Sequence, residues 1–208
     1  MGGGQLPLFI NLNKLKLKTK NMKKLILSIA IFATTTIAYS QTFNGVSISG
    51  NTQSVVDSFK ARGFKFVDSS ENTVVMKGEV TGKPFELYII TTPKSKQVCK
   101  VAGYFDEIDS WYGLEAEYNS IINIITQKYN KPDNKYAFFT KPYYKGDGYE
   151  LQALGVDKVS YSSYWFNKDN LNICVSISKF KMVKVDYENS ALMEVNTKEK
   201  AELAKKVF

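Results

Sequence analysis

The sequence predicts an α+β fold in which an antiparallel sheet carries helices packed on one face. Runs of alternating apolar and polar residues are separated by short turns, which is typical of an antiparallel meander and unlike the long crossovers of parallel sheets. Two amphipathic helical segments each precede such a meander. Their apolar stripes need a sheet face against which they can be buried.

The first half of the chain contains one helix and one meander. A short strand is expected at 43–49, and a helix at 52–62 places Val55, Val56 and Phe59 on one face. Strands are then expected at 64–68, 73–80, 85–92 and 98–105.

The second half repeats this order. Its helix, at 110–129, is the best defined element, because apolar residues from Trp111 to Tyr129 recur at helical spacing. Four or five strands are expected, at 136–139, 149–154, 158–166, 171–178 and 182–187, and a weakly amphipathic helical tail at 191–208.

The matching order suggests one unit used twice, over about 43–105 and 106–190, within a single domain at 41–208. The segments 98–104 and 182–187 are similar and stand at corresponding places. Such short matches also arise from β-sheet composition alone, so both explanations stay open.

Residues 22–40 have the parts of a secretory signal peptide. Lys23 and Lys24 precede thirteen uncharged, mostly apolar residues, and small residues at Ala38 and Ser40 predict cleavage between Ser40 and Gln41. The apolar run is shorter than the roughly 20 residues of a membrane-spanning helix. We therefore expect a periplasmic or secreted protein without a stable membrane anchor after cleavage. Residues 1–21 are interpreted as a non-folded extension ahead of the true start at Met22.

The charge of the chain lies largely in this leader. The full chain has a net charge of +8, but residues 1–40 contribute six lysines and no acidic residue, which leaves 22 basic and 20 acidic residues, a net charge of +2. This balance argues against nucleic-acid binding. The chain has no histidine, which excludes histidine-based triads and histidine-ligated zinc. No cofactor or metal is expected.

The two cysteines are not expected to form a disulfide. Cys99 alternates with apolar residues and Cys174 with polar ones, so the two fall on opposite faces of a sheet. The acidic residues around Asp106, Glu107 and Asp109 lack the spacing of a calcium loop, and capping of the second helix by Asp109 or Ser110 explains them better.

The most aromatic part of the chain supplies the candidate binding residues. Tyr143 and Tyr144 stand in a loop rich in glycine and charge, where they could contact a sugar or a protein. Tyr161 and Trp165 share a strand face with Val159 and are expected in the core.

The order of helices and strands over about 43–190, with the helix end at 127–132 and the strand segment around Trp165, resembles the β-lactamase-inhibitor-protein-like and SmpA-like exported bacterial proteins. The resemblance implies a tandem α/β fold and a binding or assembly role rather than catalysis. This chain lacks the lipid-attachment cysteine usual in SmpA-like proteins, which argues against a role in outer-membrane assembly.

The sequence thus predicts a non-catalytic exported protein that binds a protein partner. A carbohydrate-binding module based on Tyr143 and Tyr144 is the second hypothesis. A histidine-free hydrolase that uses paired carboxylates is the third, because such pairs are assembled in space and leave no local motif.

Overall fold

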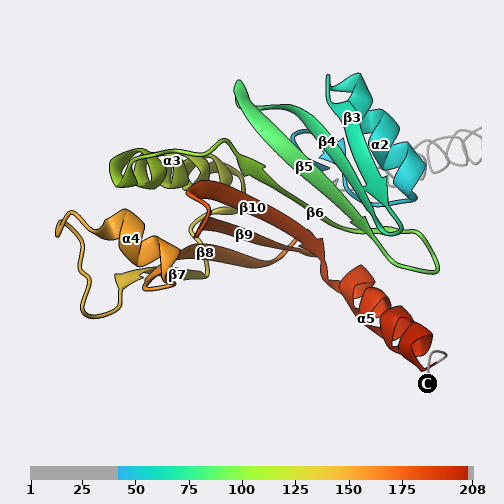
Figure 1. Ribbon diagram of the computed structural model, residues 1–208. Helices are drawn as coiled ribbons and strands as arrows, with labels where there is room; N and C mark the ends of the chain where they lie inside the picture. The colour runs from blue at the N-terminus through green and yellow to red at the C-terminus, as the bar shows by residue number, and fades with distance from the viewer. Residues whose placement is uncertain (1–41, 206–208) are drawn as a thin grey trace, which may run out of the picture. The chain divides into compact units, whose positions relative to one another are not determined.

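The structure, a computed structural model, describes residues 42–205, which fold as an α+β unit built on a large antiparallel sheet (Figure 1). The predicted fold class is therefore confirmed. The extension, signal peptide and cleavage site predicted at the N-terminus lie outside the described residues. The elements are β1 (Thr42–Phe43), β2 (Val46–Ser47), α2 (Thr52–Ala61), β3 (Lys65–Ser70), β4 (Thr73–Val80), β5 (Lys83–Thr91), β6 (Val98–Phe105), α3 (Trp111–Tyr129), β7 (Asn134–Phe139), α4 (Glu150–Gly155), β8 (Val159–Lys168), β9 (Leu171–Ser178), β10 (Met182–Asn189) and α5 (Ser190–Ala204).

The main sheet has eight strands in the order β3-β4-β5-β6-β10-β9-β8-β7, all antiparallel. Each half of the chain forms a helix followed by a four-stranded meander, and in the second half α4 lies between the first two strands, β7 and β8. The last strands of the two halves, β6 and β10, pair at the centre, with Ala102 opposite Asp186 and Tyr104 opposite Lys184. The first strands, β3 and β7, form the two edges.

The core lies between the sheet and the helices α2 and α3. Figure 1 shows α3 lying along β9 and β10 and α2 beside the β3–β5 meander. Phe59 of α2, Tyr118 of α3 and Trp165 of β8 have no exposed surface. Tyr161 is also buried, so the predicted core positions of Tyr161 and Trp165 are confirmed.

The predicted helix starts are confirmed by their caps. The Asn51 side chain accepts a hydrogen bond of 2.9 Å from the backbone N–H of Ser54 at the start of α2. The Ser110 hydroxyl accepts one of 3.1 Å from the N–H of Gly113 at the start of α3. These bonds satisfy backbone donors that have no partner within the helix.

The strand predicted at 149–154 is wrong, because this segment forms α4. Its residues Glu-Leu-Gln-Ala-Leu are strong helix formers, and the helix buries Ala153 and Leu154. A run of six residues is too short for periodicity to separate a helix from a strand. Because α4 is a helix and not a strand, the second half has four strands rather than five.

The single strand predicted at 43–49 is also wrong, because β1 and β2 form a small hairpin. Asn44 and Gly45, at φ values of 49° and 71°, form its two-residue turn. An Asn-Gly pair with both φ values positive is the preferred sequence for such a turn. The predicted helical tail is formed as α5, and Asn196 is the buried residue that it contributes.

Candidate functional site: the open face of the sheet

The face of the main sheet opposite α2 and α3, called the open face below, carries most of the accessible polar and aromatic side chains of the strands. Strand β9 shows the alternation most clearly: Leu171, Ile173, Val175 and Ile177 are buried beneath the helices, whereas the intervening residues 172–178 are half-buried on the other side. α5 continues from β10 and borders one end of this face, where Met193 and Thr197 form a hollow with Asn172 and Glu188.

Aromatic side chains stand on both halves of the open face. Tyr88 and Tyr104 meet edge to face, with ring centroids 6.0 Å apart and an interplanar angle of 87°. Beyond β9, Tyr164 stacks on Phe166 with centroids 6.0 Å apart and lies 6.1 Å from Tyr136. Rings arranged in this way provide large contact area at low cost in side-chain entropy.

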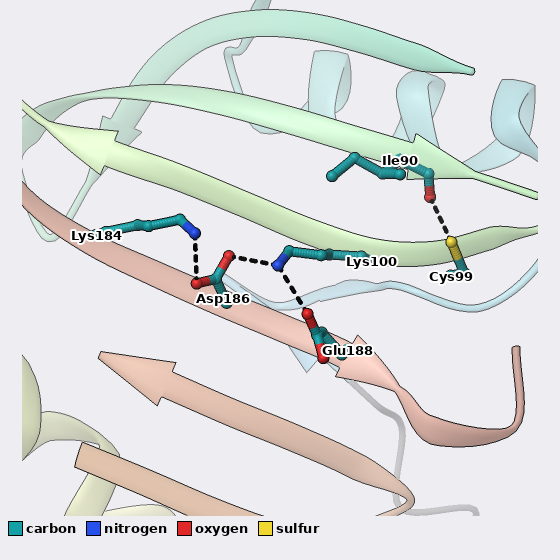
Figure 2. Close-up of polar contacts among 6 residues, drawn as sticks. All are labelled: Ile90, Cys99, Lys100, Lys184, Asp186 and Glu188. Carbon is teal, nitrogen blue, oxygen red and sulfur yellow. Dashed lines mark hydrogen bonds and ion pairs between the residues drawn. The ribbon is translucent and has the colours of Figure 1, made fainter. Parts of the chain in front are cut away.

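A cluster of four charged side chains, called the Lys100 cluster below, joins the two halves at the centre of the face (Figure 2). Lys100 Nζ lies 2.9 Å from Asp186 Oδ1 and 2.7 Å from Glu188 Oε1. Lys184 Nζ lies 2.9 Å from the other oxygen of Asp186. Figure 2 shows Lys100 on β6 reaching across to the two carboxylates of β10.

The position of Lys100 favours its charged form. Burial lowers its pKa, but hydrogen bonds and charge attraction from Glu188 and Asp186 outweigh burial, and the pKa is raised overall. Lys100 therefore stays protonated near neutral pH and holds both carboxylates, so Lys100 itself does not serve as a proton acceptor there.

Hollows lie on either side of the Lys100 cluster. One, of about 340 Å³, is formed where Glu86, Tyr88 and Tyr104 meet Phe180. A second, of about 270 Å³, is lined by Tyr164, Phe166 and Cys174 together with the carboxylates of the cluster.

The two cysteines are free, and their surroundings suppress reactivity. Burial raises the pKa of Cys174 to about 11 and also raises that of Cys99. The Cys99 thiol donates to the Ile90 carbonyl oxygen at 3.4 Å. A thiol acts as a nucleophile only when deprotonated, so neither is activated near neutral pH.

The structure places Tyr143 and Tyr144 away from the open face. Their loop is joined to α3 by Lys145, whose Nζ lies 2.5 Å from Glu115 Oε1, and Glu115 also accepts a hydrogen bond from the core residue Tyr161. The loop therefore lies on the helix side of the sheet. Tyr144 is 65% exposed, whereas Tyr143 is half-buried.

Sequence reasoning did not identify the Lys100 cluster as a site. The repeated Lys-Val pairs at 100–101 and 184–185 were visible as part of the internal match, but not their pairing across the centre. The acidic residues near the start of α3 pair with lysine: Lys181 Nζ lies 2.7 Å from Glu107 and 2.6 Å from Asp109. Over residues 42–205, no group of three or more potential ligands could hold a metal ion.

No protein-family model matches the chain, and no curated protein or solved structure was found to be similar to it. Among the described helices, none is long and apolar enough to cross a membrane.

Proposed function

We propose that the chain is an exported, non-catalytic binding protein that contacts a protein partner through the open face. The observation that carries the proposal is that α2 and α3 both pack on one face of an eight-stranded sheet, while the other face presents aromatic and charged side chains. Interfaces typically combine aromatic anchors with a polar surround.

The size of the face fits this role. Eight strands spaced by about 4.8 Å, with about eight residues each at about 3.4 Å per residue, span roughly 34 by 27 Å. This is about 900 Å², close to the roughly 800 Å² that each partner buries in a standard protein interface.

The chemistry of the face supports binding over hydrolysis. Asp186 and Glu188 lie close together, as paired catalytic carboxylates must, but Lys100 bridges them. A glycosidase needs one carboxyl that holds a proton and acts as a general acid. In the Lys100 cluster, the protonated ammonium of Lys100 instead binds both carboxylates.

Capture from an envelope extract tests the proposal. Immobilised protein comprising residues 41–208 should retain one protein at stoichiometric amounts. Tyr136→Ala, on the open face, should weaken that complex about tenfold, because truncation of an aromatic residue that anchors an interface costs about 1.4 kcal/mol or more. Tyr112→Ala is the matched control, since Tyr112 lies on α3 and is 84% exposed. Recovery of no stoichiometric protein, or equal losses in both variants, would contradict the proposal.

Export has its own test. Mass spectrometry of the protein recovered from the producing cell should find Gln41 as the first residue. A mature protein that retains residues 22–40 would overturn the proposed localisation.

One observation favours carbohydrate binding as the second candidate. The backbone N–H groups of Tyr144 and Tyr149 both donate to the Asp147 carboxylate, at 2.9 and 2.8 Å, and both rings are exposed. Exposed rings on an ordered loop can stack on sugar rings. Titration calorimetry against a glycan panel tests this candidate: binding lost in Tyr144→Ala would support it, and no heat with any glycan would count against it.

A further inference from the structure

We propose that the hollow formed by Glu86, Tyr88, Tyr104, Asp106, Glu107 and Phe180, called the cation pocket below, binds the side chain of an arginine or lysine presented by the protein partner. This inference rests on the proposed function and names the chemistry of one contact within it. The pocket lies on the open face, where the ends of β5 and β6 meet the turn between β9 and β10.

The walls of the pocket have the geometry that suits a cation. Tyr88 and Tyr104 stand almost perpendicular, with ring centroids 6.0 Å apart, so they form two adjoining walls. Phe180, 61% exposed, stands at the rim. The face of an aromatic ring carries partial negative charge and attracts an ammonium or guanidinium group within about 6 Å of its centre.

The chain's own lysines already use these rings in this way. Lys184 Nζ lies 5.9 Å from the centroid of Tyr104, and Lys179 Nζ lies 5.6 Å from that of Phe180. Both lysines are outside the set of residues that line the pocket. The interior is thus lined by rings and carboxylates, and the nearby cations lie at its border.

The charge balance leaves the pocket negative. Glu86, Asp106 and Glu107 line it, and no lysine or arginine does. Lys77 pairs with Glu86 at 3.0 Å, whereas Lys181 is shared between Glu107 and Asp109. Within the described part of the chain, Asp106 has no ion-pair partner. Of the three carboxylates that line the pocket, Glu86 and Glu107 already have lysine partners, so Asp106 is the one left to pair with an incoming cation.

The Glu86 carboxylate is also fixed in place. The Tyr88 hydroxyl donates a hydrogen bond to one of its oxygens, and Lys77 binds the other. These hydrogen bonds hold the pKa of Glu86 below its ordinary value, so the group remains charged. A preorganised anion beside the two rings costs little rearrangement when a cation binds.

The volume of the cation pocket fits one side chain. A hollow of about 340 Å³ is at the lower end of the range for small-ligand sites, and it accommodates a guanidinium or ammonium group with its aliphatic stem rather than a folded segment. Its position on the proposed interface favours a side chain delivered by a protein.

Nuclear magnetic resonance titration of residues 41–208 with acetyl-Gly-Arg-Gly-amide tests the pocket directly. The matched control peptide carries citrulline, which has nearly the same shape without charge. We expect shifts at Tyr88, Tyr104 and Phe180 with the arginine peptide, and at least fivefold weaker binding of the citrulline peptide. Equal affinity for the two peptides, or shifts confined to other surfaces, would overturn the proposal.

Two variants test whether binding of the arginine peptide depends on the negative charge of the pocket. Asp106→Asn combined with Glu107→Gln removes two exposed charges and should weaken the arginine peptide at least threefold. Glu71→Gln removes one exposed charge from the β3–β4 turn, at the opposite end of the strands, and should leave binding unchanged. If Glu71→Gln weakens binding of the arginine peptide equally, the effect comes from the overall charge of the protein and the proposal is overturned.

Two further measurements show whether the cation belongs to a protein or to a small molecule, and whether a negative result contradicts the pocket inference or the proposed function. Choline binding more tightly than the arginine peptide would assign the pocket to a small quaternary ammonium compound and overturn the protein-side-chain proposal. If a stoichiometric partner is captured but the Asp106→Asn, Glu107→Gln double variant binds it as tightly as the unmodified protein does, the pocket inference fails while the proposed function stands. If Tyr136→Ala and Tyr112→Ala weaken the partner equally, the proposed function itself fails.

Discussion

Replacement of Lys100 by methionine should destabilise the fold by about 2–3 kcal/mol. Methionine keeps most of the aliphatic stem of Lys100 and removes its charge, which leaves Asp186 and Glu188 facing each other without the bridging cation. Removal of one partner from a fully buried pair costs about 3–5 kcal/mol. The cost is smaller here because the Glu188 side chain is 32% exposed and Lys184 still holds Asp186.

Urea unfolding of residues 41–208 measures this cost. With a denaturant slope of about 2 kcal/mol per molar, the midpoint should fall by about 1 M. Lys60→Met is the control, because Lys60 belongs to an exposed pair on α2 at 3.7 Å and its loss should cost less than about 0.5 kcal/mol. Adding Asp186→Asn to Lys100→Met should cost at least about 1 kcal/mol less than Asp186→Asn alone. Additive effects, or a Lys100→Met cost below about 0.5 kcal/mol, would refute the account of the cluster.

The pH dependence gives a second measurement of the same cluster. The pKa of Lys100 is raised in the folded protein above its ordinary value of 10.5. The stabilisation is therefore complete below pH 10.5 and is lost as the pH rises through the folded pKa. The difference between the unmodified protein and Lys100→Met should be constant at neutral pH and should shrink in strong alkali.

Three other predictions follow from the core. Gly103→Ala should cost at least about 2 kcal/mol, measured by urea unfolding, because an added Cβ would collide with the Phe85 ring; a loss below about 0.5 kcal/mol would contradict this packing. Trp165→Phe should cost about 2–4 kcal/mol by the same measurement, because it leaves a cavity and removes the 2.9 Å hydrogen bond to the Asn130 carbonyl at the end of α3; a cost no greater than that of an exposed substitution would count against it. Burial raises the pKa of Tyr118 to about 12, so the folded state keeps a proton that the unfolded state loses near pH 10, and stability should fall as the pH rises from 10 to 12; tyrosinate absorbance that develops fully at pH 10 while the protein is folded would refute this.

The long elements were predictable because each repeats its pattern over several turns or residues. Helix α3 shows a full apolar stripe, and strands β4 and β5 alternate over most of their eight and nine residues between short turns. Segment 150–155 offers one and a half helical turns, and β1 and β2 have two residues each, so neither supplies enough repeats to define a period. For β1 and β2, the Asn44-Gly45 pair was the sequence feature that could have predicted the two-residue turn of the hairpin.

The open face could be predicted only in part. Alternation shows which side chains of one strand share a face, and it placed Cys174 on the polar side. It does not show which strands are neighbours, so the contact between Lys100 and Asp186, from strands in different halves, has no local signature. Likewise, Phe180 reaches the cation pocket only because the β9–β10 turn lies beside β6.

The main sheet can be divided into the two halves of the chain at the pairing of β6 with β10. Each half is a meander of local hairpins, and the strand that each contributes to the junction is the last one synthesised in that half. A backbone break between β6 and α3, at residues 106–110, would therefore leave two pieces that each keep their internal strand pairs and expose one unpaired, largely apolar strand. Such pieces are natural candidates for reassembly from separate chains, with the salt bridges of Lys100 as contacts that form only after they have joined.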